Sequence, residues 1–465
     1  MKNPSFRERG IGWHVLEPTP GGYTVPLPRL SLEEERLALL AEEVLRAELG
    51  TARVQERGAL LAMARAALAK VCARNSIKLV KEQARYLAEF IVSDLCGLCF
   101  LEPMLRDPEL EEIAVIGVGK PVYVYHSRRG WLKTNCVLTD ERRGIELINK
   151  LARGLGRRVT LRSPRLNAVL EDGSRLHASA PPLSEVELTI RKFRSEPIGV
   201  PELMGSGMFT AESLAYLWCA MQLDTCAIIA GNTASGKTSA LNALLSFIPP
   251  GERILAVEET PELSPPHEHF CRLVANAELG MGMPELVADS LRMRPDRVVV
   301  GEVRTPEEAR GLFDSMTGGQ ARGCFATMHA RSSTEALARL RSLGVPEHDL
   351  LSLDLLVVLR RAMLYSPTEK RCREARRCVE ISEVGKDGAR PVPIFALRGG
   401  KLVRTAARSL LMERAAMDFG MAEEGIGRLL RERERFLSSM PALNHYEAVQ
   451  RIWRYAYGYP AGQKG

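Results

Sequence analysis

Hydrophobic and polar positions change their period several times along this chain, and each change predicts a different kind of structure. From Ser31 to about Phe100, apolar residues return at helical spacing in segments such as LALLAEEVLRAEL and ALLAMARAALAKV. Ala, Leu, Glu and Arg dominate these segments, and all four favour helices. Ser31 and Glu34 have the spacing of a capping box, so we expect a helix to begin there. The pattern predicts an irregular, Pro- and Gly-rich arm and then a helical region, together covering residues 1–102.

After Pro103 the pattern changes to short runs that are typical of strands. EEIAVIGV, PVYVYH and EVELTIRKF are such runs, a Gly turn follows SRR, and a DG turn joins the two halves of RLNAVLEDGSRLHAS. ERRGIELINKLARGLG has helical spacing. These features predict a small α+β domain over residues 103–193. Frequent Pro and Gly residues over 194–209 predict a linker.

From Thr210 onward, strand-like and helix-like segments alternate. CAIIA, RILAVEE, RVVVGEV and CFATMHA are short apolar runs, and a helical pattern follows along the chain after each of them. This alternation predicts a parallel sheet with helices on both faces. We expect the α/β domain to cover residues 210–390 and a helical tail to cover 391–465.

Length and composition set the broad class of the protein. The chain has 465 residues, which suggests two or three domains at about 150 residues each. It is 45% apolar and 26% charged, as is usual for globular proteins. No apolar run approaches the roughly 18–20 residues that span a bilayer. The start, MKNPSFRERGIGW, lacks the apolar stretch of a signal peptide. We therefore expect a cytoplasmic protein without direct membrane insertion.

Charge and cysteine usage exclude some function classes. The net charge of +7 is a weak basic bias for so long a chain, so we expect no nucleic-acid partner. Cys96 and Cys99 form a CxxC, but Cys372 and Cys378 do not have the spacing of a second zinc-binding pair. The HEH sequence at 267–269 suggests no third ligand by its spacing. Isolated thiols in a reducing compartment are the better interpretation.

One glycine-rich segment predicts a phosphate site. Residues 231–238, GNTASGKT, fit the pattern G-x-x-x-x-G-K-[ST], with an apolar strand before it and a helical pattern after it. The glycines allow backbone N–H groups to surround phosphate oxygens at a helix N-terminus. Lys237 would reach the β- and γ-phosphates of the nucleotide, and Thr238 would ligate Mg²⁺. The predicted cofactor-binding residues are Gly231, Asn232, Thr233, Ala234, Ser235, Gly236, Lys237, Thr238 and Ser239.

Hydrolysis also needs acidic groups near the phosphates, and two strand ends offer them. Glu302 follows an apolar strand in RVVVGEV, and Glu258 and Glu259 end another in RILAVEE. Ligands of doubly wound sheets bind beyond the carboxyl ends of the strands. We therefore expect the three carboxylates to converge on the Lys237 loop. Glu302 would orient the attacking water or contact Mg²⁺ through water. The alternative for any one of them is a solvated loop residue.

The order of these motifs resembles a known family. GNTASGKTS, AVEETPEL, LRMRPDRVVVGEVR and ATMHA follow one another as in the type II/type IV secretion and pilus ATPases, and archaeal pilus and archaellum motor ATPases in particular. LEDGSRL, LTIRKF and RRCVEISEV extend the resemblance over roughly residues 95–385. It implies a RecA-like P-loop domain behind a small α+β domain. It also implies a hexameric ring that binds ATP and Mg²⁺ between the two domains.

The resemblance also assigns roles to residues. It implies that Glu258 and Glu259 form the family's acidic box, that Glu302 is its Walker B glutamate and that His329 belongs to its His box. It implies charge-compensating arginines, for which Arg175 and Arg191 are the small-domain candidates. LRMRPD contributes two further arginines, Arg292 and Arg294, as motor-domain candidates. For each arginine the alternative is a surface salt bridge.

Two departures from the family pattern bear on turnover. The acidic box has Glu where Asp is frequent, which lengthens the reach toward a metal. The His box begins with Gly318, Gly319 and Gln320 rather than with Gly-His, so only its second histidine, His329, is present. A lone histidine is more often structural than catalytic.

The function implied by the resemblance is a ring motor for pilus-like filament assembly or for secretion. Its implied partners are further copies of itself and a polytopic membrane platform protein, which it would contact at the cytoplasmic face of the membrane. Two alternatives remain. One is a DNA-transfer ATPase, and the other is a nucleotide-gated scaffold with little turnover. Preference for ATP over GTP also rests on the resemblance.

Overall fold

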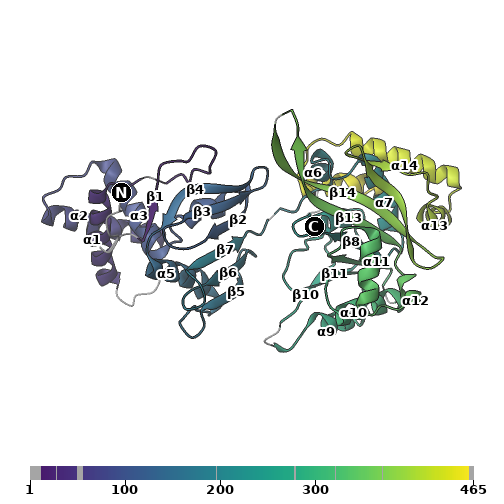
Figure 1. The fold of residues 1–465 in the computed structure, drawn as a ribbon, viewed down its shortest axis with the longest axis horizontal. Helices are drawn as coiled ribbons and strands as arrows, with labels where there is room; N and C mark the ends of the chain where they lie inside the picture. The colour runs from purple at the N-terminus through teal and green to yellow at the C-terminus, as the bar shows by residue number, and fades with distance from the viewer. Residues whose placement is uncertain are drawn as a thin grey trace. The chain divides into compact units, whose positions relative to one another are not determined.

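The computed structural model describes residues 12–27, 29–49, 56–194, 196–276, 279–319, 321–368 and 370–459. The chain divides into two compact units, Met1–Arg194 and Ser195–Gly465 (Figure 1). Each unit has a core of its own and is described by itself. Among the described residues, no helix combines the length and the apolar character needed to span a membrane.

Three helices form the first layer of unit 1. They are α1 (Leu32–Leu49), α2 (Arg57–Arg74) and α3 (Lys81–Cys96). Their facing sides bury Leu and Ala residues at helical spacing, including Leu45, Ala64 and Leu87. The expected capping box is present, because the Glu34 amide donates to Ser31 Oγ at 3.3 Å and the Ser31 amide donates to Glu34 Oε2 at 2.9 Å. The helical region predicted after Ser31 is thus confirmed.

The second layer of unit 1 is a seven-stranded sheet in the order β1-β4-β3-β2-β7-β6-β5. All its strand pairs are antiparallel. Its strands are β1 (Trp13–Val15), β2 (Leu110–Val115), β3 (Pro121–His126), β4 (Gly130–Leu138), β5 (Arg165–Val169), β6 (Arg175–Ser179) and β7 (Glu187–Arg191). The helical elements α4 (Leu101–Arg106), α5 (Glu141–Ala152) and η1 (Arg153–Leu155) accompany it. The sequence predicted β2 to β7 and α5, whereas β1 lies in the segment that we expected to be irregular.

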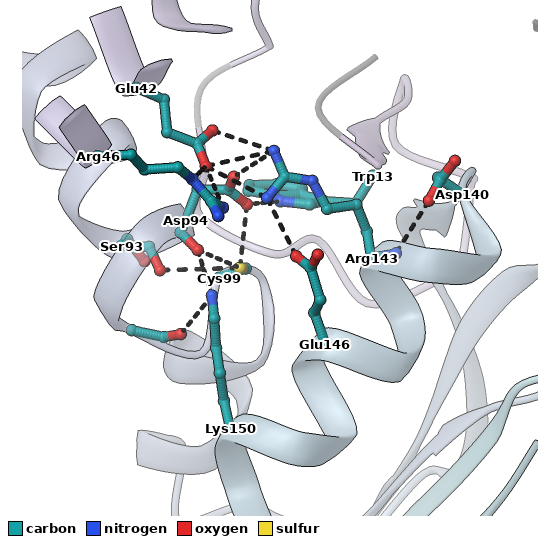
Figure 2. Close-up of polar contacts among 11 residues, drawn as sticks. Trp13, Glu42, Arg46, Ser93, Asp94, Cys99, Asp140, Arg143, Glu146 and Lys150 are labelled. Atoms are coloured by element: carbon teal, nitrogen blue, oxygen red, sulfur yellow. Dashed lines mark hydrogen bonds and ion pairs between the residues drawn. The ribbon is translucent and has the colours of Figure 1, made fainter. Parts of the chain in front are cut away.

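A buried polar cluster joins the two layers of unit 1 (Figure 2). Arg143 of α5 points toward α1 and α3, where its guanidinium lies 3.1 Å from Glu42 Oε2 and 3.7 Å from Asp94 Oδ2. Trp13 Nε1 of β1 donates to Asp94 Oδ1 at 2.9 Å. Arg46 binds the same Glu42 at 2.6 Å. Because the carboxylates of Glu42 and Asp94 are almost fully buried, these partners offset the cost of removing charge from water.

Unit 2 is built on a nine-stranded sheet in the order β10-β9-β11-β12-β8-β13-β14-β15-β16. The strands from β10 to β13 in this order are parallel. The alternating pattern predicted four of them, β8, β9, β11 and β12, whereas β10 and β13 were not predicted. The strands are β8 (Ala227–Gly231), β9 (Ile254–Glu258), β10 (Phe270–Val274), β11 (Arg297–Val303), β12 (Gly323–Met328), β13 (Leu355–Ser366), β14 (Arg371–Gly385), β15 (Arg390–Arg398) and β16 (Lys401–Arg404). This order separates β8 from β11 by one strand, which is the RecA-like arrangement that we expected.

Helices cover both faces of this sheet. One face packs against α6 (Val200–Gly205), α7 (Ala211–Gln222), α8 (Lys237–Leu245), α13 (Leu410–Asp418), α14 (Glu423–Ser438) and α15 (His445–Tyr457). The other packs against α9 (Met283–Leu291), α10 (Pro306–Thr317), α11 (Ser333–Ser342) and α12 (Glu347–Leu350). Both faces of the inner parallel strands, such as β8, β9 and β12, are therefore buried, which explains their continuous apolar sequences.

The antiparallel end of the sheet differs from the sequence prediction. We expected a helical tail from residue 391, but residues 390–404 contain β15 and β16, which extend the sheet. Their sequence, RPVPIFALRGGKLVR, has a two-Gly turn between apolar runs and should have indicated a hairpin. Helices follow only from Leu410. Gly399 and Gly400 both have positive φ, as that turn requires.

Candidate functional site

The glycine-rich loop joins β8 to α8 at the carboxyl end of the parallel strands. Ala234 and Gly236 have φ angles of +58° and +88° on either side of Ser235. When residues with positive φ alternate with residues with negative φ, their backbone N–H groups point to the same side. They then form a concave site that can bind an anion. The N-terminus of α8 adds partial positive charge there. A side chain at Gly231 would lie 2.4 Å from Ser235 Oγ, so the tight entry to the loop requires glycine.

Asn232 fixes this loop to the neighbouring strand. Its Nδ2 donates to the Arg361 carbonyl at 3.1 Å, and its Oδ1 accepts from the Arg361 amide at 2.8 Å. Ser235 is fully buried, and its amide donates to the Asn232 carbonyl at 3.2 Å. Thr233 is exposed, whereas Thr238 and Ser239 lie in the first turn of α8. The side chain of Asn232 therefore holds the loop in place through β13 and leaves the backbone groups of the loop available to a ligand.

Glu302 occupies a bulge near the end of β11. The β11–β12 register shifts between Val300 and Val303, and such a bulge redirects the side chain that it contains. Arg304 Nε donates to Glu302 Oε2 at 3.0 Å, and the same guanidinium lies 2.5 Å from Glu259 Oε2. One arginine thus links the carboxylates from the ends of β9 and β11.

Charges around Glu302 keep its carboxylate ionised. Burial by itself raises the pKa of Glu302, but the hydrogen bonds and charge of Arg304, together with the other positive charge nearby, outweigh burial. The charge of Lys237 acts in the same direction, as does His329 when it is protonated, and the net pKa of Glu302 lies below its usual range. A carboxylate ionised at neutral pH and beside a phosphate loop can accept a hydrogen bond from water.

His329 follows β12 and lies next to Glu302. Its Nε2 is 2.8 Å from Glu302 Oε1, an ion-pair distance at which no aligned hydrogen bond forms. Burial lowers the pKa of His329, and the positive charge of Lys237 lowers it further, against the opposing effect of Glu302. The ring is therefore neutral at neutral pH. Arg339 holds the His329 carbonyl at 3.2 Å.

Glu258 has a different environment from Glu259, its neighbour in sequence. It is 2% exposed, and its Oε1 accepts from the amides of Glu262 and Leu263 at 2.7 and 2.8 Å. Its Oε2 accepts from Arg272 Nε at 3.0 Å. Burial raises the pKa of Glu258 despite these partners. One oxygen is thus engaged with the loop after β9 and the other with Arg272 of β10, so this carboxylate positions the segment that carries Glu259.

The small-domain candidates lie side by side in unit 1. Arg175 of β6 and Arg191 of β7 are direct partners across the antiparallel pair, and Glu112 of β2 lies on the other side of Arg191. Like charges directly opposite each other on a sheet are destabilising. Glu112 is the acidic neighbour of this pair on the sheet.

Other sequence candidates lie in different surroundings. Arg292 is largely exposed and pairs with Asp289 on its own helix at 3.2 Å. His267 is buried, contacts the Pro249 carbonyl at 3.2 Å and has its pKa lowered to about 4, mainly by burial. Throughout the ranges that the structure describes, no three His, Cys, Asp or Glu side chains gather as metal ligands.

Two arginines of the site were absent from our sequence candidates. Arg304 is the last residue of GEVR, and its position two residues after Glu302 on a strand end was a usable signal. Arg272 could not be found in the same way, because its contact with Glu258 depends on the pairing of β10 with β9, and we did not predict β10.

Comparison with known proteins gives a consistent family. The family described as Type II/IV secretion system protein matches residues 162–414. An uncharacterised protein of Methanocaldococcus jannaschii is 35% identical over 67% of this chain and 56% of its own length. A putative conjugal transfer protein of Mycobacterium tuberculosis is 32% identical over 54% of this chain and 74% of its own. The type IV secretion system protein VirB11 of Bartonella quintana is 26% identical over 52% of this chain and 78% of its own.

This chain spans only about half the length of the Methanocaldococcus relative. The family match, in contrast, covers more than half of this chain and includes the glycine-rich loop, both acidic strand ends and His329. The motif order, the RecA-like strand order and the family match agree, and the chain belongs to the type II/IV secretion system protein family.

Proposed function

We propose that this chain is an ATPase, and that Lys237, Glu302 and His329 form the centre of its hydrolytic site. The observation that carries this proposal is the convergence of three charged or polar groups from three different elements. Glu302 on β11 lies 2.8 Å from His329 after β12, and the charge of Lys237 on α8 influences the pKa of both. If Glu302 only formed a structural salt bridge, there would be no reason for a bulge, a glycine-rich loop and a histidine to meet at the same edge of the sheet.

The residues present fit a nucleotide with Mg²⁺. The loop of residues 231–238 offers backbone N–H groups at a helix N-terminus, which suits a polyphosphate. Thr238 in the first turn of α8 would hold the metal ion directly, and Glu302 would hold it through water. When bound, the ion would neutralise charge on the phosphate oxygens. Oxygen donors of this kind are those that Mg²⁺ prefers.

In this mechanism Glu302 orients the attacking water. Its low pKa keeps it ionised, so that it can accept a hydrogen bond from that water. Neutral His329 at 2.8 Å can position the same carboxylate or contact the γ-phosphate. Arg304 holds Glu302 and Glu259 together and must share Glu302 with the water. Lys237 would bind the β- and γ-phosphates of the nucleotide.

Arg175 and Arg191 supply further positive charge in this proposal. A neighbouring copy in a ring can contribute an arginine that stabilises the transferred phosphoryl group, with effects of about 10³–10⁵ on rate. The paired position of these arginines on β6 and β7 supports this role. We propose a closed ring, most simply a hexamer, because an interface between different faces closes into a ring.

The biological role that we propose is a motor for pilus-like filament assembly or secretion. It would work at the cytoplasmic face of the membrane with a polytopic platform protein as partner. Family membership and the helical segments outside the motor domain support this role. A DNA-transfer motor is the second candidate, because one relative is named a putative conjugal transfer protein.

Two variants test the hydrolytic site. Lys237→Ala should abolish tight ATP binding, because the phosphates lose their main side-chain partner. Glu302→Gln should bind ATP but lose turnover, because an amide is a far weaker base than a carboxylate. ATP affinity and single-turnover hydrolysis should be measured for both. Wild-type turnover by Glu302→Gln would remove Glu302 from the proposed role, and DNA-stimulated turnover would favour the second candidate.

A further inference from the structure

The segment between α5 and β5, residues 153–165, concentrates exposed positive charge. Its sequence, RGLGRRVTLRSPR, has five arginines and no acidic residue. All five are exposed: Arg153, Arg157, Arg158, Arg162 and Arg165. We call this segment the basic turn. On α14, in contrast, arginines are interleaved with glutamates, whereas the basic turn places five arginines of a single sign within thirteen residues.

The basic turn is held in a defined shape. Val159 is buried, and Asn149 of α5 accepts from its amide at 2.8 Å and donates to its carbonyl at 3.2 Å. Thr160 and Ser163 exchange both backbone hydrogen bonds at 3.1 Å. Leu161 and Arg162 therefore occupy the two central positions of a tight turn. Leu161 is 78% exposed, one of the most exposed large apolar residues described.

Four of the five arginines of the basic turn form no ion pair with the described part of the unit. Arg157 donates to the Asn167 carbonyl at 2.9 Å, and Glu171 lies near Gly154. No ion pair to a described carboxylate involves Arg153, Arg158, Arg162 or Arg165. Mutual repulsion among so many like charges costs free energy, and an anionic partner would remove that cost.

A leucine at the apex distinguishes among anionic partners. Basic residues near an anionic membrane surface contribute about 1 kcal/mol each, and an adjacent apolar side chain can enter the headgroup region. Leu161 would contribute nothing to the phosphate contacts that dominate nucleic-acid binding. The arrangement of one exposed leucine with arginines beside it therefore fits a lipid surface better.

We propose that the basic turn docks this chain on an anionic phospholipid surface, with the arginines on headgroup phosphates and Leu161 among the headgroups. The inference deepens the proposed function by naming the surface through which the motor meets the membrane. It does not depend on ATP turnover, since the basic turn contains none of the residues assigned to hydrolysis.

The test is co-sedimentation of the full chain with lipid vesicles. The probe vesicles contain phosphatidylglycerol and phosphatidylcholine in equal parts, and the reference vesicles contain phosphatidylcholine alone. Wild-type protein should bind the anionic vesicles, and added salt should weaken binding. At about 1 kcal/mol per arginine, Arg158→Ala with Arg162→Ala should bind about 30-fold more weakly. Leu161→Ser should reduce binding several-fold with less change in salt dependence.

A control variant removes the same charge elsewhere in unit 1. Arg65→Ala with Arg85→Ala changes two exposed arginines of α2 and α3 and should bind vesicles as the wild type does. Equal losses in both double variants, or no preference of the wild type for anionic vesicles, would overturn the proposal. So would duplex-DNA binding that depends on Arg158 and Arg162 while vesicle binding does not. Lys237→Ala should still bind vesicles, which separates failure of docking from failure of hydrolysis.

Discussion

Arg304 is the residue on which both acidic strand ends depend. It lies 2.5 Å from Glu259 and binds Glu302, whose pKa it lowers. Arg304→Ala should raise the pKa of Glu302, so the acid limb of the pH–rate profile should move to higher pH. Hydrogen bonds to charged groups contribute about 1.5–3 kcal/mol, so turnover should fall on the order of tenfold or more.

The measurement is turnover against pH for Arg304→Ala and Arg304→Lys. Lysine keeps the charge but not the fork that binds two carboxylates, so it should recover only part of the effect. Arg310→Ala, on the exposed side of α10, is the control. An acid limb unchanged by Arg304→Ala would show that Glu302 is tuned by other groups.

Asp94 makes stability depend on pH in the opposite sense from most carboxylates. Burial raises its pKa, and the nearby charge of Glu42 raises it further, against Trp13 and Arg143. A raised folded-state pKa stabilises the fold at low pH, and this contribution is lost as pH rises from about 3.9 through the folded value. Asp94→Asn should remove this decrease in the free energy of unfolding with rising pH, because the amide does not titrate. Thermal unfolding across this pH window should show a flatter dependence in the variant, and equal slopes would contradict the prediction.

Single residues divide clearly into those that a sequence can reveal and those that it cannot. The glycine-rich loop was predictable, because its spacing encodes backbone geometry directly. Glu258 and Glu259 are adjacent in sequence, yet one is buried against loop amides and the other is exposed beside Arg304. Which of the two glutamate side chains faces the interior depends on the pleat of β9 and on the loop that follows it. These are set by tertiary contacts, which the local sequence does not reveal.

At the scale of elements, Asn232 ties the glycine-rich loop to β13. Asn232→Ala removes both hydrogen bonds to the Arg361 main chain, each worth about 0.5–1.5 kcal/mol. The loop should loosen, and nucleotide affinity should fall on the order of tenfold, because ordering the loop is then part of binding. Asn232→Asp retains the acceptor for the Arg361 amide, so its nucleotide affinity should lie between those of the wild type and Asn232→Ala. Titration with a fluorescent ADP analogue measures all three, and equal affinities would exclude a role for the tether.

The elements themselves were largely predictable where their patterns are local. The helices α1, α2, α3 and α5 have strong periodicity, and β8, β9, β11 and β12 are continuous apolar runs, and all of these predictions are confirmed. We missed β1, β10 and β13 to β16. Most of these strands are short or polar and several are rich in arginine, although β13 begins with the apolar run LLVVL. Their stability comes from pairing with strands already in place, as Arg361 pairs with Arg376 on β14. Local propensity does not contain that information.

At the scale of the whole molecule, the proposed ring predicts that turnover depends on assembly. If Arg191 acts on a neighbouring copy, specific activity should rise with protein concentration. Mixing Arg191→Ala with Glu302→Gln should recover part of the activity that each lacks, because mixed rings contain some sites with both residues. Light scattering and turnover over a concentration series provide the measurement. A monomer with constant specific activity, and no recovery on mixing, would contradict the ring.

The tether between Asn232 and Arg361 also has a consequence for biosynthesis. These residues are 129 positions apart, and β8 is flanked in the sheet by β12 and β13, both made much later. Contacts this distant in sequence form slowly, because the chain must first close a long loop. During translation, β8, which precedes the glycine-rich loop, therefore has no neighbouring strand to pair with until most of unit 2 has left the ribosome. We therefore expect the proposed ATP site to form only in chains completed past β13, and truncated products should lack it.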